Sequence, residues 1–116
     1  MQTKIYLLFF FQCFLSLALT AQQKYYNELG KEIPCNCKDY TAATPQQITC
    51  YDYFKNVTTF TCINGKKEGE EIAYYKSDTI QRKAFYKDDK KEGEEIAYYK
   101  SGTIKRKSFY KAGKKE

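Results

Sequence analysis

The sequence predicts an all-β protein, an elongated single-layer antiparallel meander of repeated β-hairpins with a disulfide-stapled N-terminal segment. Three observations lead to this prediction. Residues 66–89 and 90–113 are two copies of one 24-residue unit and differ at five positions. Each copy holds two strand-length stretches rich in isoleucine and aromatic residues, which suit strands, and turn-forming residues separate the stretches. Four cysteines lie just before the copies, between residues 35 and 62.

The first element is a predicted secretory signal peptide at residues 1–21. Lys4 is its only charged residue, and a stretch rich in leucine and phenylalanine follows and ends near Ala21. A positive start, a short apolar core and a small residue at the cleavage site define such a peptide. The alternative is a membrane anchor, but a spanning helix needs about 20 apolar residues, and Gln12 and Ser16 interrupt this shorter run. We therefore expect a secreted or periplasmic protein with no stable membrane insertion after cleavage.

Residues 22–45 are predicted to be an irregular N-terminal cap, because Pro34 and the stretch Thr-Ala-Ala-Thr-Pro are typical of loops. Removal of residues 1–21 takes away one lysine and no acid, so the formal net charge falls from +6 to +5. Basic and acidic residues are interleaved in the remaining chain, whereas nucleic-acid binders gather positive charge on one face. We therefore expect no nucleic-acid partner.

The four cysteines of the mature chain predict a disulfide framework, because their number is even and the chain is small and exported. Pairing Cys35 with Cys37 is disfavoured, since the two lie only two positions apart. Two arrangements remain open: Cys35–Cys50 with Cys37–Cys62, or Cys35–Cys62 with Cys37–Cys50. A four-thiolate zinc site is the alternative use of these residues, but its usual paired C-x-x-C spacing is absent. We therefore expect no metal.

Residues 46–116 are the predicted hairpin array, because a fixed period of this length indicates a repeat architecture. Its parts are a degenerate unit at 46–65, full units at 66–89 and 90–113, and a partial unit from 114. Either the sequence is truncated after Glu116 or the protein ends within a unit.

The degenerate unit aligns with the full units at an offset of 24 residues. In this alignment Cys50 falls where Tyr74 stands, and Cys62 falls where Tyr86 stands. Terminal repeats are commonly atypical, because they close off an exposed end of the array. The disulfides are therefore predicted to staple the N-terminal end of the array.

Within a full unit, the predicted connection between the two strands is a two-residue loop, Ser77-Asp78 or Ser101-Gly102. This loop places Lys76 opposite Thr79. A loop one residue longer would move every side chain to the other face. The two-residue loop assigns one face to Tyr75, Ile80, Ala84 and Tyr86, and the other to Tyr74, Lys83 and Phe85.

The repeated unit follows the pattern G-E-x-I-x-Y-Y-x-x-G-x-I-x-x-x-x-x-Y-x-x-G-K-K-E-G. This pattern resembles the bacterial variant of the MORN repeat, which is often assigned to YwqK-family antitoxins of toxin–antitoxin systems. The resemblance covers residues 64–116 well and 46–63 poorly, and Asp78 and Asp89 replace turn glycines. It implies a series of β-hairpins whose elongated sheet serves as an interaction surface. For an exported chain, the matching role would be immunity-like. The matching residues are Gly69, Ile72, Tyr74, Tyr75, Ile80 and Tyr86, then Gly93, Ile96, Tyr98, Tyr99, Gly102, Ile104, Tyr110 and Gly113.

We expect no enzymatic activity, no catalytic residue and no cofactor. The chain has no histidine, which is the usual general base near neutral pH. Paired carboxylates occur as Glu70-Glu71 and Glu94-Glu95, but adjacent residues of a strand point to opposite faces and cannot flank one bond.

Two functions are compatible with these features. The first is a protein-interaction scaffold outside the cytoplasm. The alternative is a cell-wall or polysaccharide-binding module whose tyrosine ladders stack on sugar rings, and membrane-surface binding comes third. The expected partner is therefore a protein or a cell-envelope polymer. The candidate interaction surface consists of Tyr74, Tyr75, Tyr86, Tyr98, Tyr99 and Tyr110.

Overall fold

The computed structural model describes residues 23–116, so the predicted signal peptide at 1–21 lies outside the described residues. Within the described range, eleven strands form one sheet in which every paired strand is antiparallel. No helix in this range is long and apolar enough to cross a membrane. The strands are β1 (Tyr25–Tyr26), β2 (Glu32–Ile33), β3 (Gln46–Tyr51), β4 (Val57–Ile63), β5 (Lys66–Lys67), β6 (Gly69–Tyr74), β7 (Ile80–Lys87), β8 (Lys90–Lys91), β9 (Gly93–Tyr98), β10 (Ile104–Lys111) and β11 (Lys114–Lys115).

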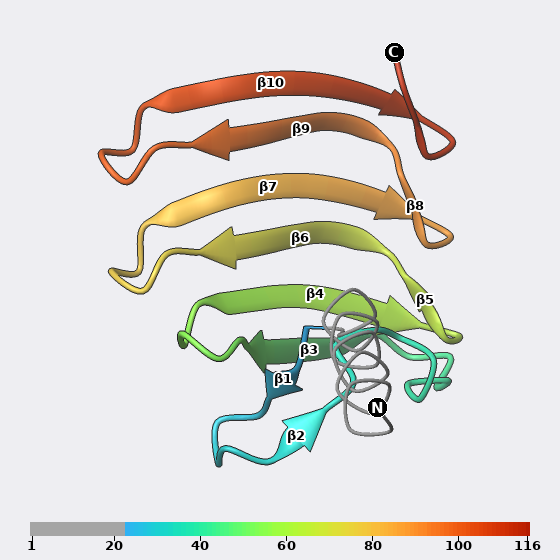
Figure 1. Cartoon of the computed structure of the whole chain (residues 1–116). Helices are drawn as coiled ribbons and strands as arrows, with labels where there is room; N and C mark the ends of the chain where they lie inside the picture. Colours follow the sequence, from blue (N-terminus) through green and yellow to red (C-terminus); the bar gives the residue numbers. More distant parts are fainter. Residues whose placement is uncertain (1–22) are drawn as a thin grey trace, which may run out of the picture.

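The strands follow one another across the sheet in the order β11-β10-β9-β7-β6-β4-β3-β1-β2, with β5 paired to β4 and β8 paired to β7. Figure 1 shows the six long strands from β3 to β10 lying side by side in a single layer, with the short β1–β2 hairpin at the N-terminal end. The predicted all-β meander of repeated hairpins is confirmed.

The loop inside each full unit has three residues, so the predicted two-residue loop is wrong. The Tyr75 amide donates to the Thr79 carbonyl at 2.8 Å, and the Asp78 amide donates to the Tyr75 carbonyl at 2.9 Å. Tyr75, and not Lys76, therefore lies opposite Thr79. The last loop residue, Asp78, has φ +68°, and a three-residue hairpin loop needs a residue in this left-handed region at that position. Aspartate is one of the few residues that tolerate it.

A β-bulge next to this loop restores the alternation that the extra loop residue would have reversed. Ile80 pairs with Tyr74, but the next pair is Arg82 with Ala73, so Gln81 is left over. The extra loop residue and the extra strand residue shift the register in opposite directions and cancel, so Ala73 lies opposite Arg82 as the two-residue loop predicts. The predicted grouping of Ala84 with Tyr86, and of Lys83 with Phe85, therefore holds, and only Ile80 changes face to join Tyr74.

The strand that opens each full unit bends at a glycine. In the second unit this residue is Gly93, which begins β9 just after the end of β8 and has φ +83°. No atom lies within 4 Å of the position that a Cβ would take there. A glycine is therefore needed at this position because of the left-handed backbone conformation, and not because a side chain would lack space.

We expect Gly93→Ala to lower the free energy of unfolding by about 1–2 kcal/mol, because a left-handed backbone is strained for residues with a Cβ. Urea denaturation of the oxidised protein measures this difference. The matched control is Lys111→Ala, a change at an exposed strand end, which should stay within about 0.5 kcal/mol of the parent. Equal stability of the parent and Gly93→Ala would show that the bend does not need the left-handed conformation.

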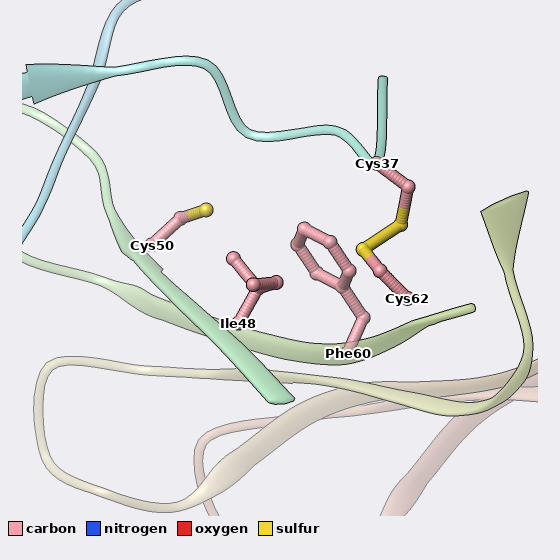
Figure 2. Packing of buried hydrophobic residues seen from close by; sticks show 5 residues of the cluster. All are labelled: Cys37, Ile48, Cys50, Phe60 and Cys62. Carbon is pink, nitrogen blue, oxygen red and sulfur yellow. A yellow bond between two sulfur atoms is a disulfide. The ribbon is translucent and has the colours of Figure 1, made fainter. Parts of the chain in front are cut away.

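The N-terminal segment packs against one face of the β3–β4 hairpin and forms the main hydrophobic core. Two disulfides join the N-terminal segment to the hairpin, Cys35–Cys50 with Cα atoms 6.0 Å apart and Cys37–Cys62 with Cα atoms 5.5 Å apart. This is the first of the two predicted arrangements, and it leaves none of these thiolates for zinc. Figure 2 shows the core side chains gathered between the segment and the hairpin. The core consists of Cys37, Ile48, Cys50, Phe60 and Cys62, with Tyr25, Ile33, Cys35 and Tyr40 packed against it.

The predicted alignment of the degenerate unit is correct for one cysteine and wrong for the other. Cys62 pairs with the first strand of the next unit just as Tyr86 does. Cys50, however, pairs with Thr58, whose equivalent Arg82 pairs with Ala73. Cys50 therefore stands at the Ala73 position, one residue from the prediction, because the β3–β4 ladder has no bulge.

The N-terminal segment also takes, through its backbone, the place that the start of a full unit has in the array. In the first full unit, the Asp89 amide in the last turn donates to the carbonyl of Lys67 at the start of the same unit, at 3.1 Å. At the degenerate unit, the equivalent Gly65 amide donates to the Tyr40 carbonyl at 3.0 Å, and the Asn64 amide donates to the Ala42 carbonyl at 2.8 Å. The cap thus accepts hydrogen bonds from turn amides that, in a full unit, donate to residues at the start of that unit.

Candidate functional site

The two faces of the sheet differ in chemistry. We call the face on which the N-terminal segment packs the cap-side face, and the other the far face. Side chains alternate between faces along a strand, and the cross-strand pairs place each residue of a unit on one or the other. The cap-side face carries Lys67, Glu71, Ala73, Arg82, Ala84 and Tyr86, and then Lys91, Glu95, Ala97, Arg106, Ser108 and Tyr110. The far face carries Ile72, Tyr74, Ile80, Lys83 and Phe85, and then Ile96, Tyr98, Ile104, Lys107 and Phe109.

The cap-side face changes from apolar to ionic along the array. Under the cap, Ile48 and Phe60 form a cross-strand pair. The equivalent pair in the first full unit is Glu71 with Ala84. Glu71 is only 3% exposed, which makes it a buried charge in a position that is hydrophobic one unit earlier.

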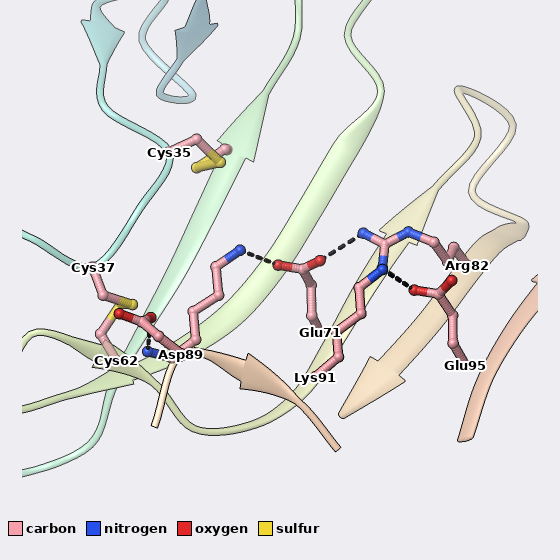
Figure 3. A network of polar contacts seen from close by, with 10 residues as sticks. Cys35, Cys37, Cys62, Glu71, Arg82, Asp89, Lys91 and Glu95 are labelled. Carbon is pink, nitrogen blue, oxygen red and sulfur yellow. Dashed lines mark hydrogen bonds and ion pairs between the residues drawn. A yellow bond between two sulfur atoms is a disulfide. The ribbon is translucent and has the colours of Figure 1, made fainter. Parts of the chain in front are cut away.

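Each buried glutamate is held by two cations. Glu71 accepts from Lys67 of its own unit and from Arg82 at 2.5 Å. Arg82 extends to Glu95 of the next unit at 3.4 Å, and Lys91 pairs with Glu95 at 2.5 Å. Figure 3 shows this row of alternating charges running across the strands. The charges therefore connect the two full units.

Burial would raise the pKa of Glu71, but hydrogen bonds from Lys67 and Arg82 outweigh this effect and hold the pKa below its ordinary value. Burial also raises the pKa of Tyr86, with a further increase from the nearby Glu71 charge. The Lys67 ammonium lies 4.5 Å from the centre of the Phe60 ring and 5.0 Å from that of Tyr86. Lysine on an aromatic face gains cation–π stabilisation, so this network is well suited to support the sheet.

The six tyrosines predicted as one interaction surface are divided between the two faces. Tyr74 and Tyr98 lie on the far face, whereas Tyr86 and Tyr110 lie on the cap-side face beneath Lys67 and Lys91. Tyr75 and Tyr99 lie just before the hairpin loops. The hydroxyl of Tyr75 donates to the Tyr98 carbonyl at 2.7 Å and so ties one unit to the next.

The far face exposes large apolar side chains that are not part of the predicted tyrosine surface. Phe85 is 46% exposed, Phe109 is 52% exposed and Ile104 is 50% exposed. The two phenylalanines occupy equivalent positions in the two full units, and each pairs with a glutamate, Glu70 or Glu94. Their recurrence at 24 residues was visible in the sequence, but their exposure depended on the register.

A groove of about 410 Å³ crosses the cap-side face. Its floor contains Ala73 and Ala97, and it is bounded by polar and basic side chains from several strands, among them Asn56, Arg82 and Arg106. Among the described residues, no cluster of three or more histidine, cysteine or acidic side chains could hold a metal ion.

A comparison with known protein families assigns each of the two full units to a repeat family. The model of the MORN repeat variant family matches residues 67–88 and 91–112. The resemblance predicted from the motif is therefore confirmed for these two segments. No curated protein and no solved structure matches the chain.

Proposed function

We propose that this MORN-repeat protein is a non-enzymatic scaffold that binds a protein partner through the far face of its sheet. The observation that carries the proposal is the exposure of Phe85 and Phe109 at equivalent positions of the two units. Aromatic residues are enriched where protein interfaces are buried, and exposed apolar patches rimmed by polar residues mark interaction sites.

The charges around these side chains suggest the chemistry of the partner. One cross-strand row of the far face reads Ile72, Lys83, Ile96 and Lys107, because each residue pairs with the next. Lysine stems can pack beside apolar side chains while their ammonium groups remain in water. A fitting partner surface therefore presents apolar side chains together with carboxylates.

We further propose that the protein works outside the cytoplasm. Two disulfides support this, since such bonds persist mainly in oxidising compartments, and residues 1–21 have the pattern of a signal peptide. The absence of histidine from the sequence supports a non-enzymatic role. An immunity-like role would be the case in which the bound partner is a toxin.

Affinity capture from the secreted or envelope fraction of the source cells, with the oxidised protein as bait, tests this proposal. We expect the double variant Phe85→Ser/Phe109→Ser to bind the captured partner about tenfold or more weakly, because central aromatic residues dominate interface energies. The matched control is Ser77→Ala/Ser101→Ala, which changes two exposed loop residues at the same 24-residue spacing. Circular dichroism checks that both variants fold. Unchanged capture by the phenylalanine variant would rule out the far face as the binding surface.

A further inference from the structure

We propose that the groove on the cap-side face is a second binding site, and that it takes a linear glycan whose sugars carry anionic groups. This site lies on the opposite face from the proposed protein-binding surface and does not depend on it. Three features of the groove support this site. They are its path across the strands, the order of the residues that line it, and the exposed charge of Arg106.

The groove runs across the strands and not along them. Its floor is one continuous cross-strand row, in which Thr58 pairs with Ala73, Ala73 with Arg82, Arg82 with Ala97 and Ala97 with Arg106. All five residues line the groove. A ligand lying in it would therefore contact the degenerate unit and both full units, and an extended ligand fits this path better than a compact one.

Small and long side chains alternate along this row. Ala73 and Ala97 leave low points in the floor, and Arg82 and Arg106 stand between or beside them. Equivalent positions of successive units are two strands apart, which is about 9–10 Å. The groove thus presents the same pattern at regular steps, as a polymer of repeating sugars would require.

The two arginines differ in their surroundings. Arg82 is engaged by both Glu71 and Glu95, whereas Arg106 is exposed in the second unit. Lys105 lies next to Arg106 on the groove, at a position where the first unit has Gln81. The second unit therefore adds positive charge to its end of the groove. A guanidinium group binds carboxylate or sulfate through paired hydrogen bonds.

The other end of the groove offers neutral hydrogen-bonding groups and aromatic rings. Thr58 and Asn56 line it together with the half-buried ring of Tyr25, and the half-buried Tyr75 lines the groove between this end and the second unit, to which its hydroxyl is bonded. Hydroxyl, amide and aromatic groups of this kind suit the hydroxyl groups and the apolar ring faces of sugars. Asp52 also lines this end, which disfavours a uniformly charged polymer such as a nucleic acid.

Titration calorimetry of the oxidised full-length chain tests the proposal with three oligosaccharide probes. These are hexagalacturonate, which carries carboxylates, a heparin hexasaccharide, which carries sulfates as well, and neutral cellohexaose. We expect at least one anionic probe to bind about tenfold or more tightly than cellohexaose, since hydrogen bonds to charged groups contribute this much. The preferred anionic probe distinguishes carboxylate from sulfate recognition. Failure of both anionic probes to bind overturns the proposal.

Variants locate the site. Arg106→Gln should weaken binding about tenfold, and Ala97→Leu should weaken it comparably by filling the floor without changing the charge. The matched control is Lys111→Gln, which removes one positive charge from the same strand outside the groove and should leave the affinity unchanged. Equal losses in Arg106→Gln and Lys111→Gln would mean that binding is unspecific charge attraction and would overturn the proposal. Phe85→Ser/Phe109→Ser should bind the glycan normally, which separates this site from the far face.

Discussion

Replacement of Cys37 and Cys62 together by alanine is expected to lower the free energy of unfolding of the oxidised protein by about 2–5 kcal/mol. The bridge spans 25 residues and restrains the unfolded chain. Its cysteines are 3% and 0% exposed, so the change also removes buried contacts from the core around Phe60. Urea denaturation measures the loss.

Hydrogen exchange measures the effect of this replacement locally, at individual backbone amides. The Asn64 and Gly65 amides donate to carbonyl groups of the N-terminal segment, so they should lose protection when the Cys37–Cys62 bridge no longer holds that segment in place. The matched control is Cys35→Ala/Cys50→Ala, which opens a loop of 15 residues and should cost about half a kcal/mol less in chain entropy. If the Cys37/Cys62 variant were as stable as the parent, the cap would not depend on this bridge.

Glu71→Gln is expected to lower the free energy of unfolding by about 2 kcal/mol at neutral pH. Removing one partner from a buried ion pair costs about 3–5 kcal/mol, but the side chains of Lys67 and Arg82 are 21% and 27% exposed, and water screens part of the interaction. The matched control is the neighbouring Glu70→Gln on the exposed opposite side of the strand. This control should change stability by less than about 0.5 kcal/mol.

The same glutamate predicts how stability depends on pH. Because the folded protein holds the pKa of Glu71 below its ordinary value of 4.5, the folded state stabilises the charged form. This contribution is fully present above pH 4.5 and is lost as the pH falls through the lower pKa of the folded state. Urea denaturation at several pH values should therefore show the parent and Glu71→Gln converging in acid. A difference that stayed constant down to pH 2 would contradict the assignment.

The repeat and its strand character could be predicted because both are local properties of the chain. Two nearly identical 24-residue segments must adopt similar conformations, and alternating aromatic and charged residues between turn residues favour strands at any position in the fold. The four cysteines near the degenerate unit similarly predicted a stapled end. Their pairing was not predictable, because spacing alone allowed two arrangements.

The loop and the bulge show why register was harder to predict. The sequence predicts Asp78 in a two-residue loop, but Asp78 adopts the left-handed conformation that ends a three-residue loop. A second irregularity at Gln81 then restores the alternation. The two deviations compensate each other, so the face of Phe85 was correct although the turn was not. Neither deviation leaves a clear signal in residue type.

The sequence by itself determined the all-β class, the 24-residue period and the alternation of side chains along each strand, because these depend on neighbouring residues. Only the tertiary structure decided that Cys37 pairs with Cys62, that Glu71 is buried between Lys67 and Arg82, and that the predicted tyrosine surface is divided between two faces. The physical reason is that each of these depends on which strands lie side by side and in what register. One residue of shift would exchange the faces and separate the charges.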